Sequence, residues 1–401
     1  MKTAVFNTIR EVPKTAWNAL LEGASCTFSH EFWEVVESAA LQNFSYRYVL
    51  FYPDEDGSGV TAAPVALACF YSVTTDIAIF APAWLRSTLN SVRKFSPGFL
   101  KLRMLECGTP ISLNSPPFPF PKDVPPRELI ETLDRLLQEI GQAEGQALIV
   151  IRDFEPNAQH LQPEFERLGY YWGDSLPNTY LDIDWKTAQD YQASMKSYYR
   201  SKLQRHLRRN QELGVRAELR DRFGDLAETL CRQWMVVHNN ADEFQREVLT
   251  PAFFREFCAR LGTHSKVLLF WRGEELVGHA LLLMDGELLR WLYFGRNEAV
   301  NDSLYIFVGY SVIEAAINLG AKRVEMGLTT YPIKHDLGAQ SLPIKMALRT
   351  VIRATNPLVA KIYPLVNSPA AVRNKNIFKD PEPVKRRGRG GAKAQATIER
   401  K

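Results

Sequence analysis

Residues 301–340 read NDSLYIFVGYSVIEAAINLG, AKRVEMG and LTTYPIKHDLGAQ. Residues 304–319 are apolar on nearly every side, a composition typical of a helix that is buried in a core. Residues 301–303 offer N-cap side chains before this helix. Gly320 stands where a helix ends in the left-handed conformation. The stretch therefore predicts a buried helix with defined ends.

A short strand and a polar loop follow the predicted helix. Residues 322–326 form the expected strand, and six polar side chains come within eight positions after it: Thr329, Thr330, Tyr331, Lys334, His335 and Asp336. A buried helix, a strand and a loop rich in titratable groups place a site at the carboxyl end of a strand in α/β folds. A plain exposed loop is the alternative, and composition alone leaves both interpretations open.

Four features in sequence order form a family pattern over residues 179–349. They are an arginine-rich helix at residues 200–209, the pair Val277-Gly278, the buried helix ending in Leu-Gly, and a strand with Glu325 and Gly327 followed by Tyr331-x-x-Lys334. Through these features the chain resembles the FemAB-like and BioF2-like acyltransferases of the GNAT superfamily. The first half resembles the family more loosely, through Trp17-Asn-Ala-Leu and a Phe-Ser-His-x-Phe run beginning at Phe28.

The resemblance implies a transferase of the GNAT N-acyltransferase type. Such an enzyme moves an acyl or aminoacyl group from an activated donor to a small-molecule or peptide amine and forms an amide. It implies no tightly bound cofactor, with acyl-CoA or aminoacyl-tRNA as the co-substrate. A tRNA partner follows if the second donor is used. The alternative is a non-catalytic, degenerate GNAT-fold module that binds RNA or an anionic partner.

The expected fold is α/β with mixed sheets, arranged as two tandem GNAT-like domains. The first covers residues 1–178, the second covers residues 179–370, and residues 371–401 form a disordered basic tail. Helix and strand patterns alternate through the first half, as in an α/β layer. The tail is polar, basic and glycine-containing, a composition that cannot bury enough apolar surface to fold.

Several element predictions bear on the site. Methionine, tyrosine and leucine at positions 195, 199, 203 and 207 predict one long helix over residues 187–213. Asp285-Gly286 between two apolar runs predicts a hairpin. Further strands are expected at residues 76–81 and 343–351, and a last helix at residues 356–366.

Charge and cysteine content restrict the class of protein. The net charge is +4, and seven Lys or Arg against two Glu in residues 381–401 account for all of it. A nearly neutral body argues against a general nucleic-acid binder, and no DNA partner is expected. The five cysteines include no C-x-x-C pair, which favours reduced thiols in a cytoplasmic protein without a metal site. No secretory signal and no apolar run of ~20 residues is visible, so no transmembrane segment is expected.

The candidate catalytic residues are Glu325 and Tyr331. Acyl transfer to an amine needs a base or water relay, and the resemblance places Glu325 on the strand that supplies this group. A carboxylate paired within the sheet is the alternative for Glu325. Tyr331 is expected to donate a proton to the leaving group.

The candidate substrate-binding residues surround these two. Lys334 is expected to bind a phosphate or carboxylate, while His335, Tyr293 and Arg296 are expected to line the same cleft. A second set lies on the basic helix and comprises Arg200, Arg205 and Arg209. Guanidinium groups on adjacent turns hold phosphates in bidentate fashion. A solvated basic face is the alternative.

The sequence also addresses the donor. A simple GNAT enzyme binds the CoA pyrophosphate with an [RQ]-x-x-G-x-[GA] loop before the helix that follows the central strand. The corresponding segment here, residues 295–302, reads GRNEAVND and does not match. The resemblance implies that members without this loop use aminoacyl-tRNA or another donor.

Overall fold

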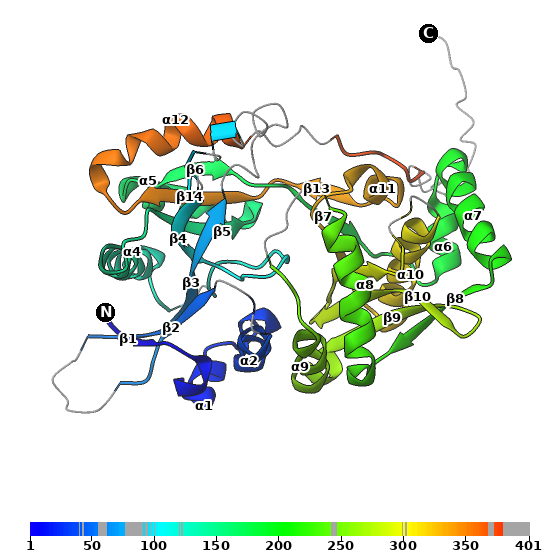
Figure 1. Cartoon of the computed structure of the whole chain (residues 1–401), viewed down its shortest axis with the longest axis horizontal. Helices are drawn as coiled ribbons and strands as arrows, with labels where there is room; N and C mark the ends of the chain where they lie inside the picture. The colour runs from blue at the N-terminus through cyan, green and yellow to red at the C-terminus, as the bar shows by residue number, and fades with distance from the viewer. Residues whose placement is uncertain are drawn as a thin grey trace, which may run out of the picture.

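Two mixed sheets, each of seven strands within the described residues, form the chain (Figure 1). The computed structural model describes residues 1–39, 41, 44–54, 62–76, 91–92, 95–96, 98–99, 101–119, 121, 123–241, 247–298, 300, 303–367 and 373–379. The first sheet contains β1 (Lys2–Phe6), β2 (Ser45–Tyr52), β3 (Ala66–Asp76), β4 (Lys101–Cys107), β5 (Leu148–Phe154), β6 (Tyr171–Asp174) and β14 (Lys345–Thr350). The second contains β7 (Asn178–Asp182), β8 (Val215–Arg220), β9 (Ser265–Arg272), β10 (Glu275–Asp285), β11 (Leu288–Arg296), β12 (Arg323–Gly327) and β13 (Gln340–Leu342).

Helices cover both sheets. In the first half they are α1 (Lys14–Ala19), α2 (His30–Ser38), α4 (Pro126–Ala143) and α5 (Gln162–Arg167). In the second half they are α6 (Ala188–Ser194), α7 (Ser197–Glu212), α8 (Ala227–Asn239), α9 (Pro251–Leu261), α10 (Leu304–Leu319) and α11 (Tyr331–Asp336). The last helix, α12 (Pro357–Val366), follows β14.

The two sheets have the same strand order and the same pairing directions. The first runs β1-β2-β3-β4-β5-β14-β6, and the second, read from its far edge, runs β8-β9-β10-β11-β12-β7-β13. Within the described residues, each sheet has one parallel pair, β4 with β5 in the first and β11 with β12 in the second, and the other strand pairs are antiparallel. The α/β class and the arrangement as two similar halves agree with the expected fold.

The chain returns to the first half after building the second. β13 ends in the second sheet at Leu342, and β14 begins in the first sheet at Lys345, where it pairs with β5 and β6 (Figure 1). α12 then packs on β14 and β6. Residues 345–366, which the predicted boundaries assign to the second domain, thus belong to the first sheet and its covering layer.

A shared apolar core joins the halves. It contains Tyr48 and Leu67 from the first sheet, and Phe253, Leu283 and Leu292 from the second half. The two sheets therefore cannot separate without exposing this core to water, which disfavours independent motion of the halves.

The buried helix and its stop are confirmed. α10 buries side chains around most of its circumference, and Gly320 ends it with φ 75°. Ser303 precedes the helix but does not cap it with its side chain, because its hydroxyl contacts His206 Nδ1 at 2.9 Å instead. Asn301 and Asp302 lie outside the described residues.

The long helix predicted over residues 187–213 is wrong. Met195 is extended (φ −70°, ψ 145°) and separates α6 from α7. It forms a β-bridge with Phe378, and the Lys196 amide donates to the Ile377 carbonyl at 2.8 Å. A distant segment thus competes for the backbone hydrogen bonds that would have continued the helix.

That same segment corrects the predicted tail. Residues 373–379 are packed, with Ile377 fully buried and the Phe378 ring 5.0 Å from the Trp185 ring. Residues 380–401 lie outside the described residues, as do residues 77–81 of the predicted strand at 76–81.

Candidate active site between the two halves

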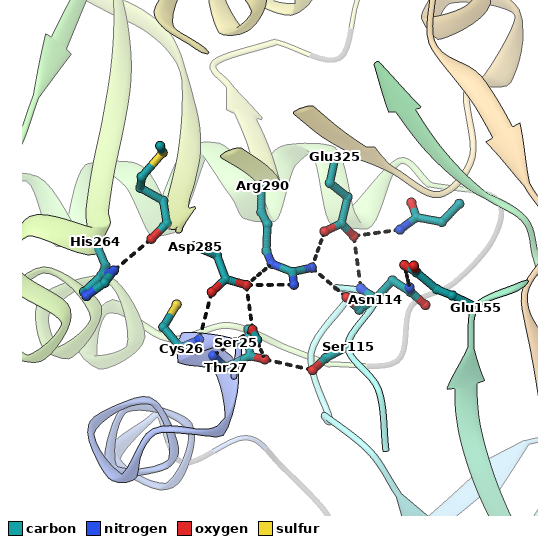
Figure 2. A network of polar contacts seen from close by, with 12 residues as sticks. Ser25, Cys26, Thr27, Asn114, Ser115, Glu155, His264, Asp285, Arg290 and Glu325 are labelled. Atoms are coloured by element: carbon teal, nitrogen blue, oxygen red, sulfur yellow. Dashed lines mark hydrogen bonds and ion pairs between the residues drawn. The ribbon is translucent and has the colours of Figure 1, made fainter. Parts of the chain in front are cut away.

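A buried ionic network links the halves beside β11 and β12 (Figure 2). Arg290 of β11 donates to Glu325 of β12 and forms an ion pair with Asp285 of β10 at 2.8 Å. Arg290 and Glu325 are 5% and 2% exposed. Burial opposes charge on Arg290, but Glu325 and Asp285 raise the pKa of its guanidinium. The group is therefore a permanent buried cation held by two carboxylates.

The first half supplies the remaining partners of this network. The backbone amide of Asn114 donates to Glu325 Oε1 at 3.1 Å, and Arg290 donates to the backbone carbonyl of Asn114 at 2.6 Å. Ser25 Oγ and the Cys26 amide donate to Asp285 at 2.6 and 2.8 Å. Burial acts to raise the pKa of Asp285, but Arg290 and these two donors hold it below its ordinary value. Figure 2 shows both first-half segments meeting the second half around Arg290.

Glu325 is consequently saturated with donors. Its Oε1 accepts from the Asn114 amide and from Asn178 Nδ2 at 2.7 Å, while Oε2 accepts from Arg290. The second interpretation from the sequence, a carboxylate paired within the sheet, describes this arrangement. Glu325 fixes the Asn114 loop rather than facing a substrate with a free oxygen.

A cavity of about 530 Å³ opens next to the Asn114 loop. One wall is the first sheet, through β4, β5 and β14, and another is α12. Its described lining is mostly apolar, and the volume lies within the usual range for small-molecule sites. It extends past the Asn114 loop to Leu328, at the carboxyl end of β12 in the second half.

Glu247 is the distinctive polar residue of this cavity wall. It is 3% exposed, and its Oε1 accepts from the Ser112 amide and the Tyr293 hydroxyl, each at 2.8 Å. Its Oε2 is buried without a hydrogen-bond partner among the described residues. Leaving such an oxygen unpaired costs roughly 1–3 kcal/mol or more for a charged group, so a ligand that donates to it would be strongly favoured.

A strained turn follows β12. Thr329 and Thr330 have φ values of 59° and 49°, which β-branched residues rarely adopt. Lys334, 2% exposed, donates through Nζ to the Gly327 and Leu328 carbonyls at 3.0 and 2.5 Å and thereby holds the turn. Burial lowers the pKa of Lys334 to about 7, against the opposing effect of Glu325. Strain of this kind concentrates at functional sites.

The other predicted loop residues lie around this turn. The Tyr331 hydroxyl donates to the Pro177 carbonyl at 2.8 Å, and His335 Nε2 lies 2.9 Å from Ser341 Oγ. Burial, and then the charge of Lys375, lower the pKa of His335. Neither residue lines the cavity, and their predicted catalytic and binding roles stay predictions.

The predicted basic residues lie elsewhere. Arg296 ends β11 and donates to the Val300 carbonyl at 2.8 Å. Arg200, Arg205 and Arg209 are on α7, outside the cavity wall, and their guanidinium groups have no hydrogen bond or ion pair within the described part of the chain. The structure thus separates the cavity from the basic helix.

α7 lies against the start of α10. His206 contacts Ser303 Oγ, and the Asn210 side chain donates to the Ser303 carbonyl at 3.2 Å. Burial, and then the charges of Lys202, Arg205 and Arg209, lower the pKa of His206. A positive field therefore surrounds the N-terminal end of a 16-residue helix, where backbone amides also attract anions.

Sequence reasoning missed Glu247, Asn114 and Arg290. The first lies just after a polar loop (residues 238–244), and nothing local distinguishes it from exposed glutamates. Asn114 precedes a proline-rich stretch, and Arg290 reads as an outward charge in a hairpin strand. Their contacts join residues 35 to 211 positions apart, so no local pattern indicates them.

The comparisons with known proteins agree with this fold. Residues 197–335 match the family model described as an acetyltransferase (GNAT) domain. The structural match to the crystal structure of FemX covers 90% of this chain and 100% of that chain, with a TM-score of 0.53 at 13% identity. It also resembles the C-terminal domain of a putative lysylphosphatidylglycerol synthetase from Agrobacterium fabrum, with a TM-score of 0.50, 9% identity, and coverage of 86% and 95%. These two likenesses concern the fold.

A curated relative matches in sequence over most of the chain. It is the putative 8-amino-7-oxononanoate synthase 2 of Mycobacterium tuberculosis, which is 26% identical over 339 residues. The match covers 82% of this chain but 42% of that relative, so the chain spans less than half of the relative's length.

Together these findings confirm the resemblance to FemAB-like GNAT acyltransferases. The match over residues 197–335 agrees with the prediction of a GNAT-type acyltransferase domain. None of the helices in the described ranges has both the length and the apolar composition to cross a bilayer.

Proposed function

We propose that this chain transfers an acyl or aminoacyl group from a phosphate-bearing donor to a primary amine bound at the cavity between the halves. The unpartnered carboxylate oxygen of Glu247 is the observation that supports an amine as the acceptor. An ammonium or amine group donates to carboxylates, and Glu247 has one buried oxygen without a partner among the described residues, on the wall of the cavity. The GNAT class supports the transfer chemistry.

Glu247 is proposed as the base. The ammonium first loses one proton to water. Its nitrogen lone pair then attacks the carbonyl carbon of the donor thioester or ester, and Glu247 takes a further proton from the nitrogen as the bond forms. A C–N bond forms and the C–S or C–O bond breaks. The leaving thiolate or alkoxide takes a proton, for which Tyr331 remains the proposed source. General base catalysis of this kind contributes roughly 10²–10⁴-fold.

Glu325 and Lys334 are proposed as positioning residues. Glu325 fixes the Asn114 loop through the Asn114 amide, and Lys334 fixes the Leu328 carbonyl. Asn114 and Leu328 both line the cavity, from opposite halves. Either residue would therefore influence turnover through the shape of the site.

The donor is proposed to bind through α7 and the start of α10. Acyl-CoA and aminoacyl-tRNA both carry phosphates, and the guanidinium groups at positions 200, 205 and 209 have no hydrogen bond or ion pair among the described residues. β11 leads to α10, and β12 runs parallel to β11. Phosphates at α10 and an acceptor beside the end of β12 would thus meet at one edge of the second sheet.

The test is a direct transfer assay with two donor arms. Purified protein receives acetyl-CoA in one arm and charged tRNA in the other, with a panel of primary amines, and amide products are detected by mass spectrometry. A new amide in either arm is expected and identifies the donor. A folded sample that yields none in both arms contradicts the proposal.

A non-catalytic module that binds RNA or another polyanion is the second candidate. The unpartnered arginines of α7 favour it, because they suit a phosphate backbone whether or not transfer follows. Steeply salt-dependent RNA binding by a protein without transfer activity would select this candidate.

A further inference from the structure

The charged groups of the cavity gather at one end. Glu106 and Arg152 lie near the carboxyl ends of β4 and β5, which run parallel, and Asp153 follows Arg152. Glu247 joins this end through its bond to the Ser112 amide, in the loop after β4. Among the described lining residues these four are the charged ones, three carboxylates and one guanidinium.

This charged end is buried and held in place by internal contacts. Arg152 Nε donates to Asp153 at 2.9 Å, and its Nη1 lies 3.8 Å from Glu106. Gly108 leaves room for it, because a Cβ there would lie 2.8 Å from Arg152 Cγ. Glu247 brings to this end a carboxylate oxygen without a hydrogen-bond partner among the described residues, so the end suits a head group that donates hydrogen bonds, such as an ammonium.

The rest of the cavity is a long apolar passage. From Glu106 back to Leu102, and from Arg152 back to Leu148, alternate side chains of β4 and β5 face the cavity, a distance of about 13 Å along each strand. Leu348 of β14 and Val359 of α12 form other parts of the wall. At the far end Ile352 and Leu358 are 66% and 50% exposed, so the passage has an apolar rim.

We infer that the acceptor is a primary amine that carries one long unbranched alkyl chain, with its amine at Glu247 and its chain along the first sheet beneath α12. This inference rests on the proposed function and names its acceptor class. A small polar amine would leave most of about 530 Å³ of apolar space unused. A chain on the donor fits less well, because the donor phosphates would then approach the carboxylate of Glu247.

The length of the chain is the measurable consequence. Each methylene removed from water contributes about 0.8 kcal/mol, or about fourfold in affinity. Affinity for a series of alkylamines from butylamine to tetradecylamine should therefore rise about fourfold per methylene and level off where the chain passes Ile352. Binding is measured by calorimetry below the micellar concentration of each amine, without donor, so the result does not depend on turnover.

A blocking variant locates the chain. Leu148→Trp fills the far part of the passage, so affinity should stop rising at a shorter alkyl chain than in the wild type. The matched control is Leu219→Trp, at a 39% exposed leucine on β8 of the second sheet. Its affinity for the amines should depend on chain length as in the wild type. Glu247→Gln should lower the affinity for every amine by a similar factor and keep the same rise in affinity per methylene. This variant tests the head group if Leu148→Trp does not fold.

The outcomes separate the two proposals. The chain assignment is overturned if affinity does not rise with chain length in the wild type. It is also overturned if affinity rises to the same chain length in folded Leu148→Trp as in the wild type. Decanoate binding as tightly as decylamine overturns the head-group assignment. Faster transfer from decanoyl-CoA than from acetyl-CoA to butylamine, with no gain from decylamine, places the chain on the donor and overturns the inference. Chain-dependent binding without any amide product would contradict the proposed function, while the assignment of the apolar passage to an alkyl chain would stand.

Discussion

At the residue scale, the site depends on buried charges whose environments differ. Glu325 and Glu247 are both nearly inaccessible glutamates close to the junction of the halves. Donors occupy both oxygens of Glu325, whereas Glu247 keeps one oxygen unpartnered among the described residues. The number of donors therefore distinguishes Glu325, which positions a loop, from Glu247, which is proposed to meet a ligand.

Lys334 should make stability depend on pH. The folded pKa of about 7 lies below the ordinary value of 10.5, so between these values the unfolded chain binds a proton that the folded chain does not. The free energy of unfolding of the wild type should therefore rise with pH in this window relative to Lys334→Met, by up to about 1.4 kcal/mol per pH unit. Urea unfolding at several pH values measures both slopes, and equal slopes would contradict the low pKa of Lys334.

At the element scale, the sequence predicted the elements whose pattern lies within one short stretch of the chain. α10 and Gly320 were predictable because an all-round apolar stretch followed by glycine permits few alternatives. The break between α6 and α7 was not, because the stripe of Met195 to Leu207 contains no breaker and Phe378 lies far along the chain. The loop after β12 was recognised as polar, but the position of its Tyr331 depends on the Pro177 carbonyl, which comes from the other half.

The network between β10, β11 and β12 should be a main contributor to stability. Arg290→Met leaves Asp285 and Glu325 as two buried carboxylates without their cation, and should lower the free energy of unfolding by about 3–5 kcal/mol. Glu325→Gln should cost less, because Arg290 keeps Asp285. Chemical denaturation measures both variants.

The matched control is Arg272→Met, which breaks an exposed pair with Glu275 and should have no measurable effect. If Glu325→Gln abolished turnover without any change in unfolding, Glu325 would be a catalytic group rather than a positioning one.

At the scale of the whole molecule, the return of β14 to the first sheet makes the site a product of both halves. The Asn114 loop and the first-sheet wall come from the first half, while Glu247 and Leu328 come from the second. The sequence indicated two similar α/β halves because each has its own helix and strand patterns. It did not indicate the return, since an apolar strand at residues 343–351 fits either sheet equally well.

The basic helix should act on the donor alone. Arg205→Ala combined with Arg209→Ala should weaken donor binding and make the plot of log affinity against log salt less steep by about two, one for each lost phosphate contact. Amine binding should be unchanged, because α7 does not line the cavity. Arg135→Ala, at an exposed arginine of α4 on the first half, is the matched control. An unchanged salt dependence would place the donor phosphates elsewhere.

The transfer rate of Glu247→Gln is the measurement to make first. The substitution keeps the shape of the side chain, and its amide oxygen can still accept from Tyr293 and the Ser112 amide. With the donor and amine that support turnover, kcat/KM should fall by at least about 100-fold while the unfolding transition stays in place. Glu228→Gln, at an exposed glutamate of α8, should match the wild type. Equal rates for Glu247→Gln and the wild type would contradict amine activation at the cavity between the halves.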